Sequence, residues 1–332
     1  MLRSGRVRLQ LLEEKLCQDG QDRKDRLIRL LLLCCLILSG CQMSQTEFEP
    51  SISYTPTTQL TVSRASAFPP LLASERRQDW GKELVIGDAF ACEMDLYRAL
   101  TCYKRADVLI PEKFPERRLQ INYNIVQCYY LGDKHQETID AFEKGPLSFV
   151  SPSFPAFDDL IIMLYESYQC VDQTEKACKF LQLIESRAPE TASRLRLSEA
   201  LLHADFCVLD DEPELADFTA NYHAQTLSVR RAQVLNAFLP GAGYLYIGQK
   251  QSALTSFVLN ALFIAAAYHF FENGNIAAGL ITSSLEAGWY FGGINGAGLA
   301  AKEFNERLYS GSTRELMIQR RLFPVLMLQC AF

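Results

Sequence analysis

The chain has 332 residues and a formal net charge of −6, with 48% hydrophobic and 22% charged residues. This balance excludes a wholly disordered or wholly membrane-embedded chain, and the acidic total disfavours nucleic acid as a partner. The 11 cysteines include no CxxC pair, which disfavours a zinc site or a thioredoxin-like motif. We expect most of them to be small buried residues, and one or two disulfides stay open as an alternative for an exported domain.

The N-terminal residues 1–41 are predicted to be a targeting signal. Within RKDRLIRLLLLCCLILSGC, four basic residues precede an apolar run of about nine residues, too short to span a bilayer, and the run ends in Leu-Ser-Gly-Cys. This stretch resembles the signal peptide and lipobox of bacterial lipoproteins. The resemblance implies cleavage before Cys41, lipidation of its thiol and a place in the bacterial cell envelope. An uncleaved anchor is the alternative, and the long stretch before the basic cluster suggests a start codon assigned too early.

Residues 42–78 are predicted to be a disordered linker. Ser, Thr and Pro dominate this stretch and no helical or strand period is present. Such a composition is typical of a flexible or extended tether.

Residues 79–228 show a helical pattern with a period of 39 residues. Ala99, Tyr103, Ala106 and Pro111 form the first example of a small–aromatic–small–proline pattern, and shifts of 39 residues give weaker matches. The pattern resembles the tetratricopeptide repeat, in which small residues let two antiparallel helices approach and an aromatic residue fills the gap. It predicts an all-α fold with three helix pairs and a degenerate fourth that caps the array. A plain bundle of helical hairpins is the alternative.

The tetratricopeptide resemblance implies a partner-binding groove on the first helix of each pair. Transferring the usual groove positions to this chain gives six candidate contacts: Asp88, Tyr123, Gln127, Tyr130, Glu166 and Gln169. Tyrosines and glutamines without a basic cluster suit an extended peptide or a partner helix. The implied role is protein–protein interaction, with a solvated face as the alternative for each position.

Residues 229–304 are predicted to form a two-helix membrane hairpin. Two largely apolar stretches, 252–271 and 276–301, are each long enough to cross a hydrocarbon core, and the short turn ENGN joins them. They follow the stretch PGAGYLYIGQK at 240–250, which resembles the opening of a hairpin in uncharacterised bacterial membrane proteins. The glycines of this opening are expected to allow a sharp entry turn.

The second stretch carries small residues at four-residue spacing, which predicts close helix packing. This stripe consists of Ser284, Gly288, Gly292, Gly296 and Ala300. Glu286 and Asn260 fall at the same depth of the two stretches, so a hydrogen bond between them is expected to fix the hairpin. A docking or ion site for another membrane protein is the alternative for Glu286.

The predicted location is the inner membrane, with the repeats on the periplasmic side and the chain lipid-anchored, integral or both. The flanking basic residues favour the opposite orientation, so the topology of the hairpin stays open. Residues 305–332 form a basic and apolar tail that suits a membrane surface.

The predicted function is a membrane-anchored protein-interaction scaffold, and the alternative is an integral subunit of a transport or insertion complex. The expected partners are a protein and membrane lipid. No catalytic motif, metal site or cofactor site is recognised in the sequence, so no enzymatic activity is expected.

Overall fold

The computed structural model describes residues 48–58 and 64–332, so the predicted signal peptide and Cys41 lie outside the described residues. Within these ranges the regular structure is helical, and the only extended pairing is an isolated bridge between Ser66 and Ala331. The chain divides into two compact units. Of the described residues, one unit contains 48–49 and 227–304, and the other contains 50–226 and 305–332. An all-α fold is therefore confirmed for the described residues.

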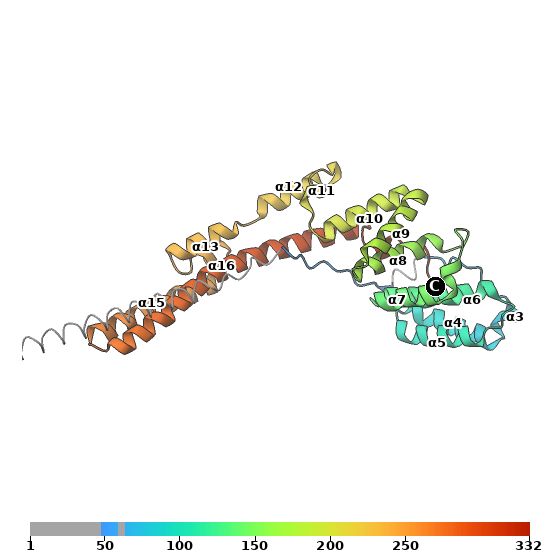
Figure 1. Cartoon of the computed structure of the whole chain (residues 1–332), viewed down its shortest axis with the longest axis horizontal. Coiled ribbons are helices and arrows are strands. Elements are labelled where there is room, and N and C mark those ends of the chain that lie inside the picture. Colours follow the sequence, from blue (N-terminus) through green and yellow to red (C-terminus); the bar gives the residue numbers. More distant parts are fainter. Residues whose placement is uncertain (1–47, 59–63) are drawn as a thin grey trace, which may run out of the picture. The chain divides into compact units, whose positions relative to one another are not determined.

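The larger unit is built from helices that pack in consecutive antiparallel pairs (Figure 1). The helices are α4 (Asp79–Cys92), α5 (Leu96–Leu109), α6 (Pro115–Leu131), α7 (His135–Lys144), α8 (Phe157–Cys170), α9 (Thr174–Arg187) and α10 (Pro189–Leu202). A short 3-10 helix, η1 (Pro146–Phe149), lies between α7 and α8. In addition to the contacts between successive helices, α6 contacts α8 directly.

The same turn joins the two helices of the first three pairs. Met94, Asp133 and Asp172 adopt left-handed backbone conformations with φ of 61°, 58° and 59°. In each turn the following N–H reaches back to a carbonyl five residues earlier, and Lys134 N to Tyr129 O, at 2.9 Å, is one example. This 6→1 bond closes the end of the first helix and redirects the chain into the second. The turns recur at the 39-residue spacing seen in the sequence.

The small and aromatic residues of the sequence pattern form the contact inside the first pair. Ala99, Tyr103 and Ala106 on α5 are fully buried. A Cβ placed on Gly87 of α4 would lie 2.6 Å from the Tyr103 ring. Only glycine therefore lets α4 approach the aromatic ring this closely.

Irregular elements close the far end of the array. After α10 come α11 (Phe206–Leu209), the 3-10 helix η2 (Pro213–Leu215) and α12 (Ala216–Gln225). The later part of α16 (Ile276–Gln319) packs here, because Tyr309 is buried against the rings of Phe206 and Tyr222 and donates to Leu201 O at 2.8 Å. The predicted fourth pair is thus replaced by short elements and a helix from far along the sequence.

The smaller unit contains α13 (Val229–Phe238), α14 (Ala242–Tyr246), α15 (Lys250–Glu272) and the first part of α16. Gly241, with φ of 93°, begins α14, and its N–H donates to Asn236 Oδ1 at 2.8 Å. A Cβ at Gly241 would collide with the carbonyl of Ala253 on α15. The entry turn predicted for PGAGYLYIGQK therefore requires glycine for both its φ and its close approach.

A second glycine turn leads from α15 into α16. Gly274 has φ of 73°, and Asn275 N donates to Phe270 O at 2.9 Å. By length and composition, α15 is the one helix of residues 48–58 and 64–332 that is suited to crossing a membrane. The beginning of α16 does not reach that level, because its glycines, serines and Glu286 lower its hydropathy. The sequence predicts two such helices, and the described residues contain one.

Two predicted boundaries are corrected by the packing of the larger unit. Part of the predicted linker folds there, since α3 (Ala73–Arg76) contacts α4 and Glu75 is buried. The predicted surface tail also belongs there, and its last residues are buried around α17 (Pro324–Met327). The apolar side chains of this tail, which were predicted to lie on a membrane surface, are buried in the larger unit.

Candidate functional site

Residues Leu322–Phe332, here called the tail segment, lie against α8 and neighbouring helices. The segment begins after Arg321, whose φ of 55° ends the long helix α16. The side chains of Leu322, Phe323, Leu328 and several others in the segment are buried. Its final residues contact Asp159 on α8 and Gln127 on α6. The tail segment contacts Gln127, one of the six predicted groove residues.

Asp159, near the start of α8, holds the backbone of the tail segment. Its carboxylate accepts the N–H of Gln329 at 2.9 and 3.0 Å and the N–H of Cys330 at 2.8 Å. The side chain is buried, with 2% of the residue exposed. Burial raises the pKa of Asp159, and the two backbone N–H groups and the nearby Arg64 oppose that rise. The carboxylate therefore depends on the tail segment for its hydrogen bonds.

Further contacts continue along the segment toward Phe332. Gln127 on α6 donates from Nε2 to the carbonyl of Cys330 at 3.2 Å. The Phe332 ring stacks on Tyr103, with 6.2 Å between ring centroids. Burial raises the pKa of the Cys330 thiol to about 11, helped by the charge of Asp159. The segment is thus held by main-chain hydrogen bonds and an aromatic contact.

A second segment, residues 64–72, covers the tail segment and is here called the strap. Ala331 N donates to Ala65 O at 2.9 Å, in the isolated parallel bridge. Arg64 donates to the carbonyls of Val325 and Leu326 at 3.2 and 3.3 Å. The tail segment therefore has hydrogen-bond partners on both sides, the repeat helices and the strap.

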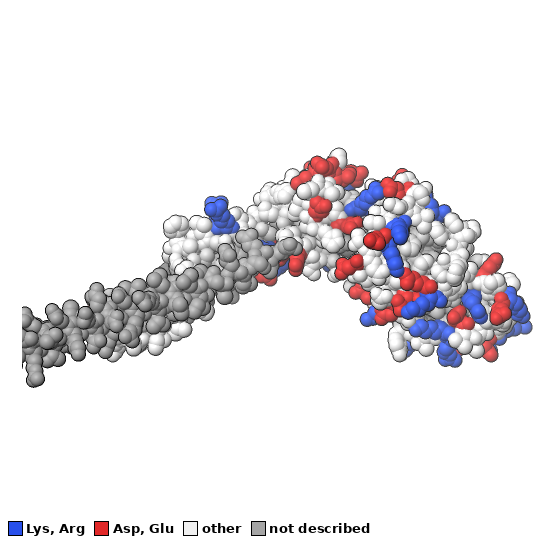
Figure 2. Space-filling view, viewed as in Figure 1, with Lys and Arg blue, Asp and Glu red and all other residues white. Residues whose placement is uncertain are grey.

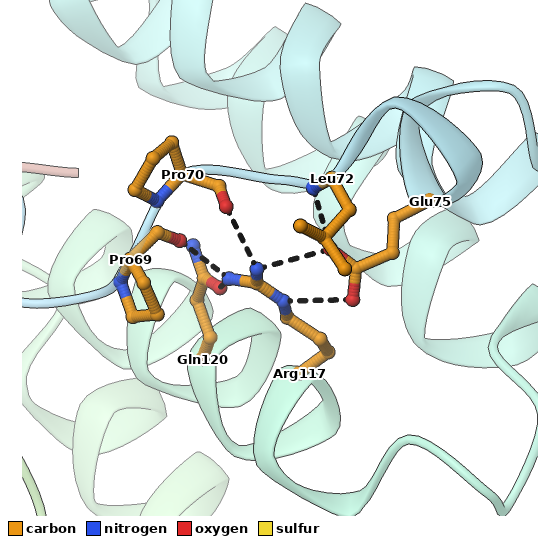
Figure 3. Close-up of polar contacts among 6 residues, drawn as sticks. All are labelled: Pro69, Pro70, Leu72, Glu75, Arg117 and Gln120. Atoms are coloured by element: carbon orange, nitrogen blue, oxygen red, sulfur yellow. Dashed lines mark hydrogen bonds and ion pairs between the residues drawn. The ribbon is translucent and has the colours of Figure 1, made fainter.

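Arg117 on α6 fixes the strap to the repeat helices (Figure 3). Its guanidinium donates to the carbonyls of Pro69 and Pro70 at 2.7 and 3.0 Å and pairs with Glu75 at 3.0 Å. Burial alone would raise the pKa of Glu75, but Arg117 and the Leu72 N–H hold it below its ordinary value. A planar, five-donor group is needed to satisfy this many acceptors at once.

The six predicted groove residues lie on α4, α6 and α8, and the three on α6 are buried. Gln127 is the one with a hydrogen bond to the tail segment. Tyr123 is fully buried, with the rings of Phe68 and Phe154 at 5.6 and 6.0 Å. Asp88 accepts from the Tyr103 hydroxyl at 2.8 Å, and burial raises its pKa to about 6. It therefore supports the ring on which Phe332 stacks.

The remaining three groove residues join neighbouring helices to one another. The buried Tyr130 hydroxyl donates to Glu166, and burial raises the pKa of that carboxyl to about 7 although the hydrogen bond opposes it. Gln169 donates to Glu199 of α10 at 2.8 Å. These side chains connect α6 to α8 and α8 to α10, so their observed role is in stacking the repeats.

The predicted hydrogen bond between Glu286 and Asn260 is not formed. Asn260 donates from Nδ2 to Ser256 O on its own helix at 2.6 Å. Its Oδ1 and both Glu286 oxygens have no hydrogen-bond partner among the described residues. A backbone carbonyl four residues earlier on the same helix is the nearer acceptor for the Asn260 amide.

The small-residue stripe packs only in part within the smaller unit. A Cβ added to Gly288 or Gly292 would lie in open space, whereas a Cβ added to Gly296 would collide with the Tyr244 hydroxyl. Ser284 donates to Leu280 O at 2.9 Å on its own helix, and Ala300 packs beside the cluster around Ala232. Inside the hairpin, close contact is made by Gly279, where an added Cβ would lie 2.7 Å from the Phe271 ring of α15, a position outside the predicted stripe.

Three features of the site are not predicted from the sequence: Asp159, Arg64 and the tail segment. Asp159 follows Asp158 at the start of a helix, where an acidic residue ordinarily suits the helix dipole. Arg64 lies in a stretch with no periodicity. The apolar run LFPVLML, too short to cross a membrane, was the available signal for a buried segment.

The surface of the repeat unit carries both signs of charge (Figure 2). Basic and acidic side chains are interspersed there, and ion pairs such as Lys176–Glu143 and Arg187–Asp158 connect them. Cys102, Cys128, Cys170, Cys178, Cys207 and Cys330 are free thiols. Comparison of the chain with protein-family models, with curated proteins and with solved structures found no match.

Proposed function

We propose that this chain is a membrane-bound, tetratricopeptide-like scaffold that binds an extended peptide segment of a partner protein. The proposal is carried by hydrogen bonds to the tail backbone: Asp159 accepts the N–H groups of Gln329 and Cys330, and Gln127 donates to the Cys330 carbonyl. A site that hydrogen-bonds to backbone atoms accepts peptides of varied sequence, because these atoms do not depend on the side chain. Its chemistry is binding rather than catalysis.

The recurring helix pairs support the tetratricopeptide-like part of the proposal. Equivalent turns at Met94, Asp133 and Asp172 follow the 39-residue period, and α6 and α8 lie next to each other. Stacked helix pairs of this kind present an extended inner surface for ligands. The contacts of the tail segment with α8 and α6 are consistent with a ligand on that surface.

The apolar exterior of α15 supports the membrane part of the proposal. Leu254, Leu262, Ile264 and Tyr268 are each more than half exposed. Such a surface is unfavourable in water and suits lipid. Together with the lipoprotein-like signal ending at Cys41, it leads us to propose a bacterial envelope protein with membrane lipid as its second partner.

The peptide-binding function is tested by selection of random 11-residue peptides on the detergent-solubilised full chain. Selection is run on the wild type and on Gln329→Pro, which removes one N–H donor of the tail segment. We expect peptides to be enriched, and Asp159→Asn to lose them because its carboxylate no longer accepts two N–H groups. Asp158→Asn, on the exposed neighbour that pairs with Arg187, is the matched control and should retain them. Failure of both wild type and Gln329→Pro to enrich any peptide contradicts the proposal.

A second candidate function is docking to another membrane protein through α16. The open space beside Gly288 and Gly292, next to a cavity of about 640 Å³ that also borders Trp289, favours it. Gly292→Leu should then reduce co-purification of membrane partners. Gly311→Leu, at another helical glycine with open space, is the matched control. Equal co-purification by the two variants contradicts this function.

A further inference from the structure

The tail segment contacts the repeat helices mainly through its backbone. Gln329 N, Cys330 N and Cys330 O are the groups that meet Asp159 and Gln127, and Ala331 N meets the strap. The Gln329 side chain is exposed. Any segment with two consecutive free N–H groups can make the same hydrogen bonds, whereas one with proline at either position cannot.

Side chains of the tail segment add a simple sequence requirement. Leu328, Ala331 and Phe332 are buried, with 3%, 6% and 8% of their surfaces exposed. Phe332 stacks on Tyr103, while Gln329 between these anchors faces outward. The site therefore selects a large apolar residue, three positions later a small residue, and then an aromatic residue.

The tail segment leaves three buried polar atoms of α6 without hydrogen-bond partners. Tyr123 Oη, Asn124 Oδ1 and Gln127 Oε1 are buried and have no hydrogen-bond partner among the described residues. The three residues are at most 2% exposed. Buried polar atoms of this kind are ordinarily paired. A peptide offering donors to these atoms would bind better than the tail segment does.

We infer that the tail segment is an internal occupant of the peptide site, which a partner segment of the same chemistry replaces. The partner is a protein with an extended five-residue segment: a large apolar residue, two residues with free N–H groups of which the first has any side chain, a small residue and an aromatic residue. The inference rests on the proposed peptide-binding function. Its mechanism is competition. The tail segment occupies most sites, so the apparent Kd for the partner equals the intrinsic Kd divided by the fraction of sites that are free.

Competition is measured with a fluorescein-labelled peptide of residues 322–332 carrying Cys330→Ser and an N-terminal lysine extension for solubility. Anisotropy is recorded on the full chain in detergent for the wild type, Gln329→Ala and Gln329→Pro. We expect Gln329→Ala to bind like the wild type, because the side chain is exposed and the N–H remains. Gln329→Pro should bind about tenfold tighter or more, the change expected from freeing a site held by a hydrogen bond to a charged group.

The backbone requirement is checked with the same peptide N-methylated at the residues equivalent to Gln329 and Cys330. We expect no binding of this probe to any variant. If all three chains bind the unmethylated probe equally and reject the methylated one, peptide binding stands and internal competition is wrong. If none binds, both the inference and the proposed function are wrong.

Hydrogen exchange on the wild type gives a readout that does not depend on Gln329→Pro folding. Excess unlabelled peptide should accelerate exchange of the N–H groups of the chain's own Gln329 and Cys330, while those in the centres of α6 and α8 stay protected. Unchanged exchange at Gln329 and Cys330 under saturating peptide would overturn the inference.

Discussion

Asp159 and Cys330, 171 residues apart in the sequence, are joined by a 2.8 Å hydrogen bond between a buried carboxylate and a backbone N–H. The same carboxylate also accepts the N–H of Gln329. This pairing places the end of the described chain against α8. It makes a segment that resembles a membrane-surface tail part of the larger unit.

Removing this carboxylate should destabilise the larger unit. Asp159→Ala leaves two backbone N–H groups without their acceptor, at a cost of about 2 to 4 kcal/mol in the free energy of unfolding. Denaturant unfolding of the purified chain measures the loss. Asp158→Ala, which removes a partly exposed pair with Arg187, should cost at most about 1 kcal/mol. Equal effects of the two substitutions would show that Asp159 does not hold the tail segment.

Releasing the strap should expose a protease site. Arg117→Ala removes the clamp on Pro69 and Pro70 and leaves buried Glu75 unpaired, which costs about 3 kcal/mol. Trypsin should then cleave faster after Arg76 and Arg77. Arg117→Lys should not restore protection, because an ammonium group cannot reproduce the planar fork.

The control for the strap is Arg98→Ala, which breaks a largely exposed pair with Asp95. It should leave the cleavage rate at Arg76 and Arg77 unchanged and cost less than about 1 kcal/mol. An Arg117→Lys chain as resistant as the wild type would contradict the clamp.

Glu166 should make the stability of the repeats depend on pH. Burial raises its pKa from 4.5 to about 7, so the folded state binds the proton more tightly than the unfolded state. The associated stability is fully present below pH 4.5 and is lost as pH rises toward about 7. Glu166→Gln keeps an acceptor for the Tyr130 hydroxyl but cannot titrate. The difference between the unfolding free energies of the wild type and Glu166→Gln should therefore vary across this window, and a constant difference would contradict the assignment.

A charge on the exposed face of α15 should weaken membrane integration. Ile264→Arg places a cation near the middle of the helix, at a cost of about 2.5 to 3.5 kcal/mol in a bilayer. The change is made in a Cys41→Ala chain, so that the predicted lipid anchor cannot retain the protein, and alkaline extraction of membranes measures the loss. Gln251→Arg, at the start of α15, is the matched control and should stay membrane-bound. Complete extraction of the Cys41→Ala chain with native Ile264 would contradict a membrane role for α15.

The helix pairs could be predicted from sequence because their signals are local. Ala99, Tyr103 and Ala106 lie on one face of one helix, so their spacing reports the packing directly. The glycines of PGAGYLYIGQK indicate a tight turn for a similar reason, since Gly241 needs only its own φ and one close neighbour. The positions of α4, α6 and α8 followed from the same periodicity.

The occupant of the site was decided only by tertiary structure. Periodicity reports which residues of one helix share a face, but it does not report which distant segment covers that face. The tail segment and Asp159 meet across 170 residues through backbone atoms that every residue possesses, so no side-chain pattern marks the pairing. By itself the sequence determined a helical chain with an apolar helix, whereas long-range packing decided that Leu322–Phe332 is buried against α8.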